Sequence, residues 1–394
     1  MSTASRVARV LIVAGEASGD LYGGLLMRAM AAEGPVAFSG IGGPTMRAAG
    51  LAAVADASVL AVTGILEVVA RFSSIWGAWR ATASLLEDSR QRPDLAILID
   101  YPDFNLRLAA RAKRAGVPVL YFIAPQVWAW RKGRLARMRR VIDRILVILP
   151  FEEAIYRDAA IPVEFVGHPL LDLVRPERTR AQTRALLGLD PDRPIVALLP
   201  GSRRNELRAH LGPLLGAARI LGEEFRDLQF ALTVAPTMPR PLVQSLMAAC
   251  PGPSRPPVLV SEDRYDAVAA ADAAIVASGT ATLETALLGV PLVVVYRMNA
   301  LTYALARLAT DLPHIGMPNL IAGRRIAPEL VQGDCTPQRI AAETRRLLTD
   351  PEAAGAMRQG LEEVRGRLGR PGAIGRAARA AWDMVRPANG DRAG

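Results

Sequence analysis

The chain has 394 residues, of which 51% are hydrophobic and 22% charged, and its formal net charge is +10. This is an ordinary globular balance, and the length predicts two to three domains with their own cores. No apolar run reaches the roughly 18 residues that span a bilayer, which excludes a membrane-spanning protein and leaves peripheral contact. Cys250 and Cys335 form no metal or redox motif, which indicates a cytosolic protein with free thiols.

The basic excess favours anionic partners, namely phosphates, nucleic acid or a membrane surface. Lysine occurs only at Lys113 and Lys132, so arginine supplies almost all of the positive charge. Such a ratio also indicates a bias in genome composition.

The first half alternates apolar runs with helical patterns, and the apolar run at 10–14 leads into a strand-to-helix turn rather than a signal peptide. Strands are expected at 7–14, 36–39, 95–99, 117–122 and 145–149, and helices at 21–32 and 106–115. This rhythm predicts a doubly wound parallel sheet with helices on both faces.

Residues 167–178 carry two prolines and several charges, which suits an interdomain linker. The rhythm then restarts, with strands expected at 195–199, 229–234, 258–260 and 273–277, and helices at 206–225, 281–288, 337–348, 351–368 and 374–385. The prediction is therefore an α/β fold of two Rossmann-like doubly wound parallel-sheet domains facing a cleft. The domains are 1–170 and 171–370, and residues 371–394 form a helix that crosses back and a disordered tail.

The stretch 271–297 reads as strand, tight turn, helix, turn and strand. Its first turn, Ser278-Gly279-Thr280, offers free amides at a helix N-terminus, where an anion is favoured. Glu284 follows one turn later and could accept hydrogen bonds from sugar or ribose hydroxyls. The alternative is a capped helix whose glutamate suits the helix dipole.

A second turn, Gly201-Ser202-Arg203, ends the first strand of the second domain. Its amides can approach a ligand, and Arg203 can donate two hydrogen bonds to one phosphate. Asn319 lies in a loop rich in proline and glycine and could bind a phosphate or sugar, or could simply shape the loop.

Acidic residues follow two strands of the first domain. Glu16 and Asp20 would repel a pyrophosphate but could bind a sugar, unless this turn is only a helix start capped by Ser18. Asp100 and Asp103 are candidates for base and binding roles, and Asp103 could also cap the following helix.

An aromatic and basic run contains Trp128, Trp130, Arg131 and Arg134, and further arginines extend it to Arg144. Trp beside Arg suits a membrane interface or stacking on bases, and the alternative is a solvated helix face. The apolar stretch at 64–79 suits a lipid-contacting surface or a dimer face.

In chain order, the strings GEASGD, IDYPDFN, VWAWR, LPFE, VGHPL, LPGSR, SGTATLE and MPNLIAG resemble the motifs of lipid-A-disaccharide synthase, a GT-B type inverting glycosyltransferase. The resemblance covers about residues 10–332. It implies transfer of 2,3-diacylglucosamine from UDP to the 6-hydroxyl of 2,3-diacylglucosamine 1-phosphate (lipid X). The products would be the β-1,6-linked lipid A disaccharide 1-phosphate and UDP.

The resemblance also assigns residues. It implies that Asp103 is the base or positions the acceptor, with Glu16 beside it, and that Glu284 binds the ribose. Arg203 and Asn319 are implied near the UDP phosphates. No metal or other cofactor is implied.

The implied partners are UDP-2,3-diacylglucosamine, lipid X and the anionic surface of the inner membrane of a Gram-negative bacterium, on its cytoplasmic face. The C-terminal segment is long enough to exchange between the subunits of a homodimer. Two alternatives remain, a UDP-N-acetylglucosamine 2-epimerase and a non-catalytic nucleic-acid-binding protein. The second leaves the ordered turns at the strand ends unexplained.

Overall fold

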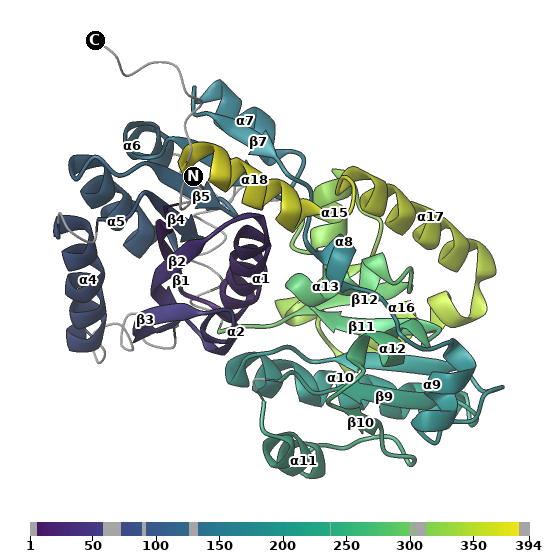
Figure 1. Ribbon diagram of the computed structural model, residues 1–394. Helices are drawn as coiled ribbons and strands as arrows, with labels where there is room; N and C mark the ends of the chain where they lie inside the picture. The colour runs from purple at the N-terminus through teal and green to yellow at the C-terminus, as the bar shows by residue number, and fades with distance from the viewer. Residues whose placement is uncertain are drawn as a thin grey trace. The chain divides into compact units, whose positions relative to one another are not determined.

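The computed structural model describes residues 6–57, 72–88, 92–125, 133–236, 238–299, 303 and 313–385 (Figure 1). The chain divides into two compact units. Unit 1 comprises residues 1–169 and 369–394, and unit 2 comprises residues 170–368. No helix among these residues is long and apolar enough to cross a membrane.

Unit 1 is built on a seven-stranded parallel sheet in the order β3-β2-β1-β4-β5-β6-β7. The strands are β1 (Ala8–Ala14), β2 (Val36–Gly42), β3 (Leu51–Asp56), β4 (Leu95–Ile99), β5 (Val119–Phe122), β6 (Arg144–Val147) and β7 (Val163–Phe165). β4 reads LAILI with every side chain buried, as expected of a strand covered on both faces. Its neighbours β1 and β5 are almost as apolar, so the core of unit 1 follows the middle of the sheet.

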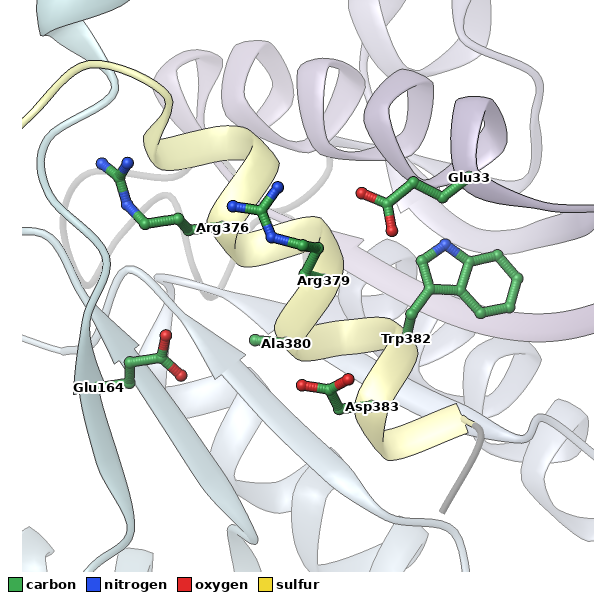
Figure 2. A pocket seen from close by; sticks show the side chains of 7 residues that line it. All are labelled: Glu33, Glu164, Arg376, Arg379, Ala380, Trp382 and Asp383. Atoms are coloured by element: carbon green, nitrogen blue, oxygen red, sulfur yellow. The ribbon is translucent and has the colours of Figure 1, made fainter. Parts of the chain in front are cut away.

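Seven helices pack around this sheet within the described part of unit 1. They are α1 (Ala17–Glu33), α2 (Pro44–Ala48), α4 (Phe72–Glu87), α5 (Pro102–Arg114), α6 (Arg134–Val141), α7 (Glu152–Asp158) and α18 (Ala373–Val385). α18, from the end of the chain, packs against α1, and the Trp382 indole donates a 3.1 Å hydrogen bond to the carbonyl of Met30. Beside α18 lies a polar pocket that contains none of the predicted site residues (Figure 2).

Unit 2 is built on a six-stranded parallel sheet in the order β10-β9-β8-β11-β12-β13. Its strands are β8 (Ile195–Leu199), β9 (Gln229–Thr233), β10 (Val258–Val260), β11 (Ala273–Ala277), β12 (Leu292–Tyr296) and β13 (Glu329–Val331). Its helices are α8 (Leu170–Leu173), α9 (Arg180–Leu186), α10 (Arg204–Glu224), α11 (Arg240–Ala248), α12 (Arg264–Ala269), α13 (Thr280–Leu287), α15 (Met317–Ala322), α16 (Pro337–Thr349) and α17 (Pro351–Arg367), with one 3-10 turn at Gln332–Asp334. The predicted class, two α/β domains with parallel sheets, is confirmed.

The helix caps that were considered as alternatives for Ser18 and Asp103 are wrong. α5 begins at Pro102, so Asp103 lies inside its first turn and Tyr101 occupies the cap position in a left-handed conformation. α1 begins at Ala17, which places Ser18 inside the helix and Glu16 at the cap position. In both cases the helix starts earlier than its apolar periodicity indicates, because only two residues separate it from the preceding strand.

Candidate active site

The strand order reverses once in each sheet, between β1 and β4 in unit 1 and between β8 and β11 in unit 2. In open α/β sheets, ligands bind beyond the carboxyl ends of the strands at such a switch point. Glu16 and Asp100 follow β1 and β4, and Arg203 and Gly279 follow β8 and β11. The predicted turns of each domain therefore meet at the expected edge of its own sheet.

The turn after β4 holds its backbone in an uncommon conformation. Asp100 and Tyr101 both have left-handed backbones, with φ of 47° and 45°. The carbonyl of Asp100 accepts hydrogen bonds from the Tyr121 hydroxyl at 2.5 Å and from Asn105 Nδ2 at 2.7 Å. Non-glycine residues are strained in this region and persist where the surroundings hold them. Tyr121 and Asn105, both fully buried, supply that restraint.

Asp100 and Asp103 have different electrostatic surroundings. Burial, and then the negative charge of Glu16, raise the pKa of Asp100 to about 6. The Asp103 side chain is 75% exposed, and its Oδ1 lies 2.5 Å from the Arg134 guanidinium. A carboxylate that is desolvated and lies near another negative charge is a better proton acceptor than one paired with arginine. The surroundings therefore favour Asp100 for a base and Asp103 for binding.

Asp20 has a structural role in unit 1. Its side chain is buried and accepts hydrogen bonds from the backbone amides of Gly43 (2.7 Å), Thr45 (2.9 Å) and Met46 (3.0 Å). It thereby binds the amides at the start of α2, and a Cβ on Gly43 would lie 2.8 Å from its carboxylate. The suggestion that Asp20 binds a sugar is not supported, because the carboxylate is already bound within the fold.

The turn after β8 is held by a carboxylate of the chain itself. Oε2 of Glu206 accepts hydrogen bonds from the amides of Ser202 (3.0 Å) and Arg203 (3.2 Å), and Gly201 has φ of 115°. Arg203 remains 55% exposed, 3.4 Å from Glu206. The predicted phosphate contact is therefore available to the Arg203 side chain, whereas an anion would have to displace Glu206 from the two amides.

His210 ties this turn to the end of β12. It is buried on α10, and its Nε2 accepts a 2.8 Å hydrogen bond from the amide of Arg297. Its Nδ1 therefore carries the proton and donates to the carbonyl of Pro200 at 3.0 Å. Burial lowers the pKa of His210, in keeping with a neutral ring that joins two strand ends.

The turn after β11 leaves its backbone accessible. Gly279, with φ of 146°, and Thr280 are exposed at the start of α13, while the Ser278 hydroxyl donates to the carbonyl of Ile315 at 2.8 Å. One turn into the helix, Glu284 is 17% exposed and accepts a 2.8 Å hydrogen bond from the Tyr265 hydroxyl. Gly279, Thr280 and Glu284 are therefore brought to one edge of unit 2 and remain available to a ligand.

Asn319 is buried, and its amide is fully used inside unit 2. Its Nδ2 donates to the carbonyl of Ala327 and to Glu329, and its Oδ1 accepts from the amides of Ile326 and Ala327. An asparagine side chain has two donors and two main acceptor positions, so no hydrogen bond remains for a phosphate. This geometry favours a positioning role for Asn319 over the predicted contact with UDP.

The predicted membrane residues are only partly described. Trp128, Trp130 and Arg131 lie outside the described residues. Arg134 is described, and its side chain is 18% exposed and paired with Asp103. In the part of the chain that the structure describes, no group of three or more His, Cys, Asp or Glu side chains could hold a metal ion.

Sequence reasoning missed three residues that organise these turns: Tyr121, Glu206 and Tyr265. Glu206 had a usable signal, since an acidic residue three positions after a helix start is the capping-box spacing. Tyr121 and Tyr265 had none, because they lie 21 and 19 residues from the groups that they bind.

Comparison with solved structures agrees with this architecture. A UDP-GlcNAc 2-epimerase from Neisseria meningitidis, bound to UDP-GlcNAc, has a TM-score of 0.65 at 13% identity, covering 96% of this chain and 99% of that one. MurG of Acinetobacter baumannii has a TM-score of 0.58 at 17% identity, covering 96% and 100%. The two parallel-sheet units therefore define a protein of the GT-B class.

Sequence comparison is more specific. The family model described as lipid-A-disaccharide synthetase matches residues 10–374. Lipid-A-disaccharide synthase of Syntrophus aciditrophicus is 48% identical over 380 residues, covering 96% of this chain and 98% of that protein. The Myxococcus xanthus enzyme is 43% identical over 380 residues, with the same coverage. The chain belongs to the lipid-A-disaccharide synthase family and is a glycosyltransferase of lipid A biosynthesis.

Proposed function

We propose that the two sheet edges divide the reaction, with the turns of unit 1 binding the acceptor and those of unit 2 binding the UDP part of the donor. The acceptor is lipid X, and the donor is UDP-2,3-diacylglucosamine. Transfer to the 6-hydroxyl gives the β-1,6-linked disaccharide 1-phosphate and UDP. The observation that carries this division is the kind of group at each edge. After β1 and β4, unit 1 presents the carboxylates Glu16 and Asp100, which can accept a hydroxyl proton. After β8 and β11, unit 2 presents Arg203 and an exposed helix N-terminus, which can bind a diphosphate.

In unit 1, the proton of the acceptor hydroxyl passes to a carboxylate after β4. The raised pKa of Asp100 favours this residue, because its carboxylate is desolvated and lies near the negative charge of Glu16. Asp103, on the first turn of α5, would then bind the acceptor together with Arg134. The sequence-based assignment of Asp103 as the base stays a prediction, and the variants compared in the Discussion distinguish the two.

In unit 2, Arg203 binds the diphosphate and the amides at the start of α13 stabilise the departing UDP. The support is that Arg203 is more than half exposed and that Gly279 and Thr280 are exposed at a helix N-terminus. Charge develops on the leaving phosphate in the transition state, so donors fixed in advance lower the barrier. Glu284 accepts hydrogen bonds from the ribose.

A mass-spectrometric assay of purified protein tests this proposal. Given UDP-2,3-diacylglucosamine and lipid X with EDTA present, the enzyme should form disaccharide 1-phosphate and UDP in equal amounts. Without lipid X, neither should appear. A product formed from the UDP-sugar alone would instead indicate an epimerase, which needs no acceptor.

We propose further that one face of unit 1 contacts the anionic inner leaflet, where the acylated substrates reside. α4 and α6 both pack against α5. Trp76 on α4 is 50% exposed and stacks on Trp79, and Arg139 and Arg140 are exposed on α6. An exposed tryptophan on one helix and exposed arginines on another helix that packs against the same neighbour suit a membrane interface.

Vesicle sedimentation tests the membrane contact. Arg139→Glu with Arg140→Glu should release the protein from anionic vesicles, because both side chains are exposed and their loss breaks no described ion pair of unit 1. A matched control, Arg226→Glu with Arg240→Glu, makes the same charge change at exposed positions of unit 2. Equal binding by both double variants would contradict the proposal.

A homodimer through the C-terminal segment is the remaining proposal. In this chain α18 packs against α1 of unit 1, so a dimer of this kind would exchange α18 between two copies. Light scattering of the full chain and of a variant ending at residue 370 would test it. If both proteins have the same number of chains per particle, the result would count against the exchange.

A further inference from the structure

Glu284 is held by two residues from the start of α12. The Tyr265 hydroxyl donates to Oε1 of Glu284 at 2.8 Å, and a guanidinium nitrogen of Arg264 lies 3.5 Å from the same oxygen. Arg264 also donates to the Tyr265 hydroxyl at 3.0 Å, with its guanidinium 4.8 Å from the centre of the ring. The three side chains form one directed chain of hydrogen bonds, from Arg264 through Tyr265 to Glu284.

The direction of this chain is fixed by chemistry. Burial and the charge of Glu284 raise the pKa of Tyr265 to about 12, so the phenol keeps its proton and donates it to the carboxylate. The guanidinium can only donate. Glu284 is therefore the acceptor at the end of the chain of hydrogen bonds.

Among the described residues, the side-chain contacts of Glu284 fall on one carboxylate oxygen. All the contacts above end on Oε1, and Oε2 of Glu284 makes no hydrogen bond with any residue that the structure describes. Glu284 lies one turn into α13, beside the switch point between β8 and β11, and is 17% exposed. One oxygen is thus anchored, and the other is left for a ligand at the sheet edge.

We propose that Tyr265 and Arg264 are positioning residues for nucleotide recognition, which hold Glu284 by Oε1 so that Oε2 accepts from the ribose diol. This inference rests on the proposed ribose role of Glu284. Neither side chain needs to touch the nucleotide, because the contacts of both with Glu284 fall on Oε1. A carboxylate fixed before binding loses less conformational entropy when the nucleotide arrives.

Calorimetric titration of the full-length protein with UDP and with 2′,3′-dideoxyuridine diphosphate tests the proposal. Tyr265→Phe keeps the ring and removes only the hydroxyl. It should lower the affinity for UDP about tenfold, which is the effect expected when one hydrogen bond to a charged group is lost. It should leave the dideoxy compound unaffected, because that compound has no diol to bind. Arg264→Met should weaken UDP about threefold, in line with a partly exposed ion pair.

The controls separate this inference from the proposal beneath it. Tyr156→Phe removes a phenol hydroxyl that bonds Pro125 in unit 1, and it should leave UDP binding unchanged. Glu284→Ala should weaken UDP and spare the dideoxy compound. If Glu284→Ala weakens both equally, the ribose assignment itself is wrong.

If Glu284→Ala weakens binding of UDP but not of the dideoxy compound, and Tyr265→Phe weakens neither, the ribose assignment stands and the positioning role is overturned. If Tyr265→Phe weakens both ligands equally, Tyr265 acts elsewhere on the nucleotide, which also overturns it. Melting temperatures of the variants identify any loss that comes from unfolding.

Discussion

Glu16 and Asp100 follow neighbouring strands of one sheet, and the negative charge of Glu16 adds to burial in raising the pKa of Asp100 to about 6. The parallel pairing of β1 with β4 places Ala14 opposite Ile99, so the next residues of both strands emerge at the same edge. Two carboxylates held close together repel each other when both are ionised, so one of them keeps its proton to a higher pH.

The first prediction concerns the base. The wild-type kcat/KM should rise with pH through about 6 and then level off, because the base acts only when it is deprotonated. Asp100→Asn should lower kcat about a hundred- to ten-thousandfold and remove this limb of the profile. Asp103→Asn should weaken binding of the acceptor but keep the acid limb of the kcat/KM profile. A limb that survives in Asp100→Asn and vanishes in Asp103→Asn would return the role to Asp103.

The second prediction concerns Glu16. Glu16→Gln removes the negative charge while preserving shape, so the pKa of Asp100 should fall and the acid limb of kcat/KM should move to lower pH. Burial is the larger cause of the raised value, so the shift should be partial. The control is Glu33→Gln at the far end of α1, which should leave the limb in place. No movement in Glu16→Gln would show that burial alone sets the pKa.

The third prediction links the same carboxyl to stability. Because the pKa is raised from 3.8 to about 6 on folding, the folded state holds its proton where the unfolded state has lost it. Stability should therefore fall as pH rises between about 4 and 6, by about 2 to 3 kcal/mol, and stay low above that range. Asp100→Asn should be more stable than the wild type at pH 7 and equal to it near pH 3, as urea unfolding at each pH would show. A less stable variant at pH 7 would contradict this.

The sequence predicted those elements whose apolar runs are bounded by breakers. β4, β8, β10 and β11 match their expected bounds, since each is a short apolar run between polar or turn residues. β3 was missed because its run LAAVA is mostly alanine, a residue depleted in strands, and only Leu51 in it is buried. β13 was missed because it begins with the charged Glu329 and so has only two apolar residues, whereas the equally short β10 is apolar throughout.

In the candidate site, too, local sequence predicted some features and missed others. The turns were predictable because a ligand site at the end of a parallel strand needs only local sequence. The partners of each side chain were not, since Asp20 binds amides 23 to 26 residues away and Asn319 binds segments beyond its own helix. Periodicity describes one element at a time, whereas these contacts depend on which loops the sheet order brings together.

The fourth prediction concerns Asp20. Asp20→Ala leaves three backbone amides at the start of α2 without their acceptor, two of them in buried hydrogen bonds, and it should destabilise unit 1 by about 2 to 4 kcal/mol. Asp20→Asn keeps Oδ1, which binds Gly43 and Met46, but loses the acceptor for Thr45, so its cost should be smaller. Chemical unfolding measures both. Equal stability of Asp20→Ala and the wild type would show that water replaces the carboxylate.

The last prediction separates contact from positioning at Asn319. Because all four hydrogen bonds of its amide are made inside unit 2, Asn319→Ala should destabilise the protein by about 3 kcal/mol even without ligand. Asn319→Asp should cost more, because a second carboxylate would replace the amide that donates to Glu329. Pairing Asn319→Asp with Glu329→Gln restores a donor opposite the new carboxylate and should recover part of the loss. A side chain that contacted only UDP would show none of these effects in the ligand-free protein, and its removal would instead appear as a lower affinity for UDP at unchanged melting temperature.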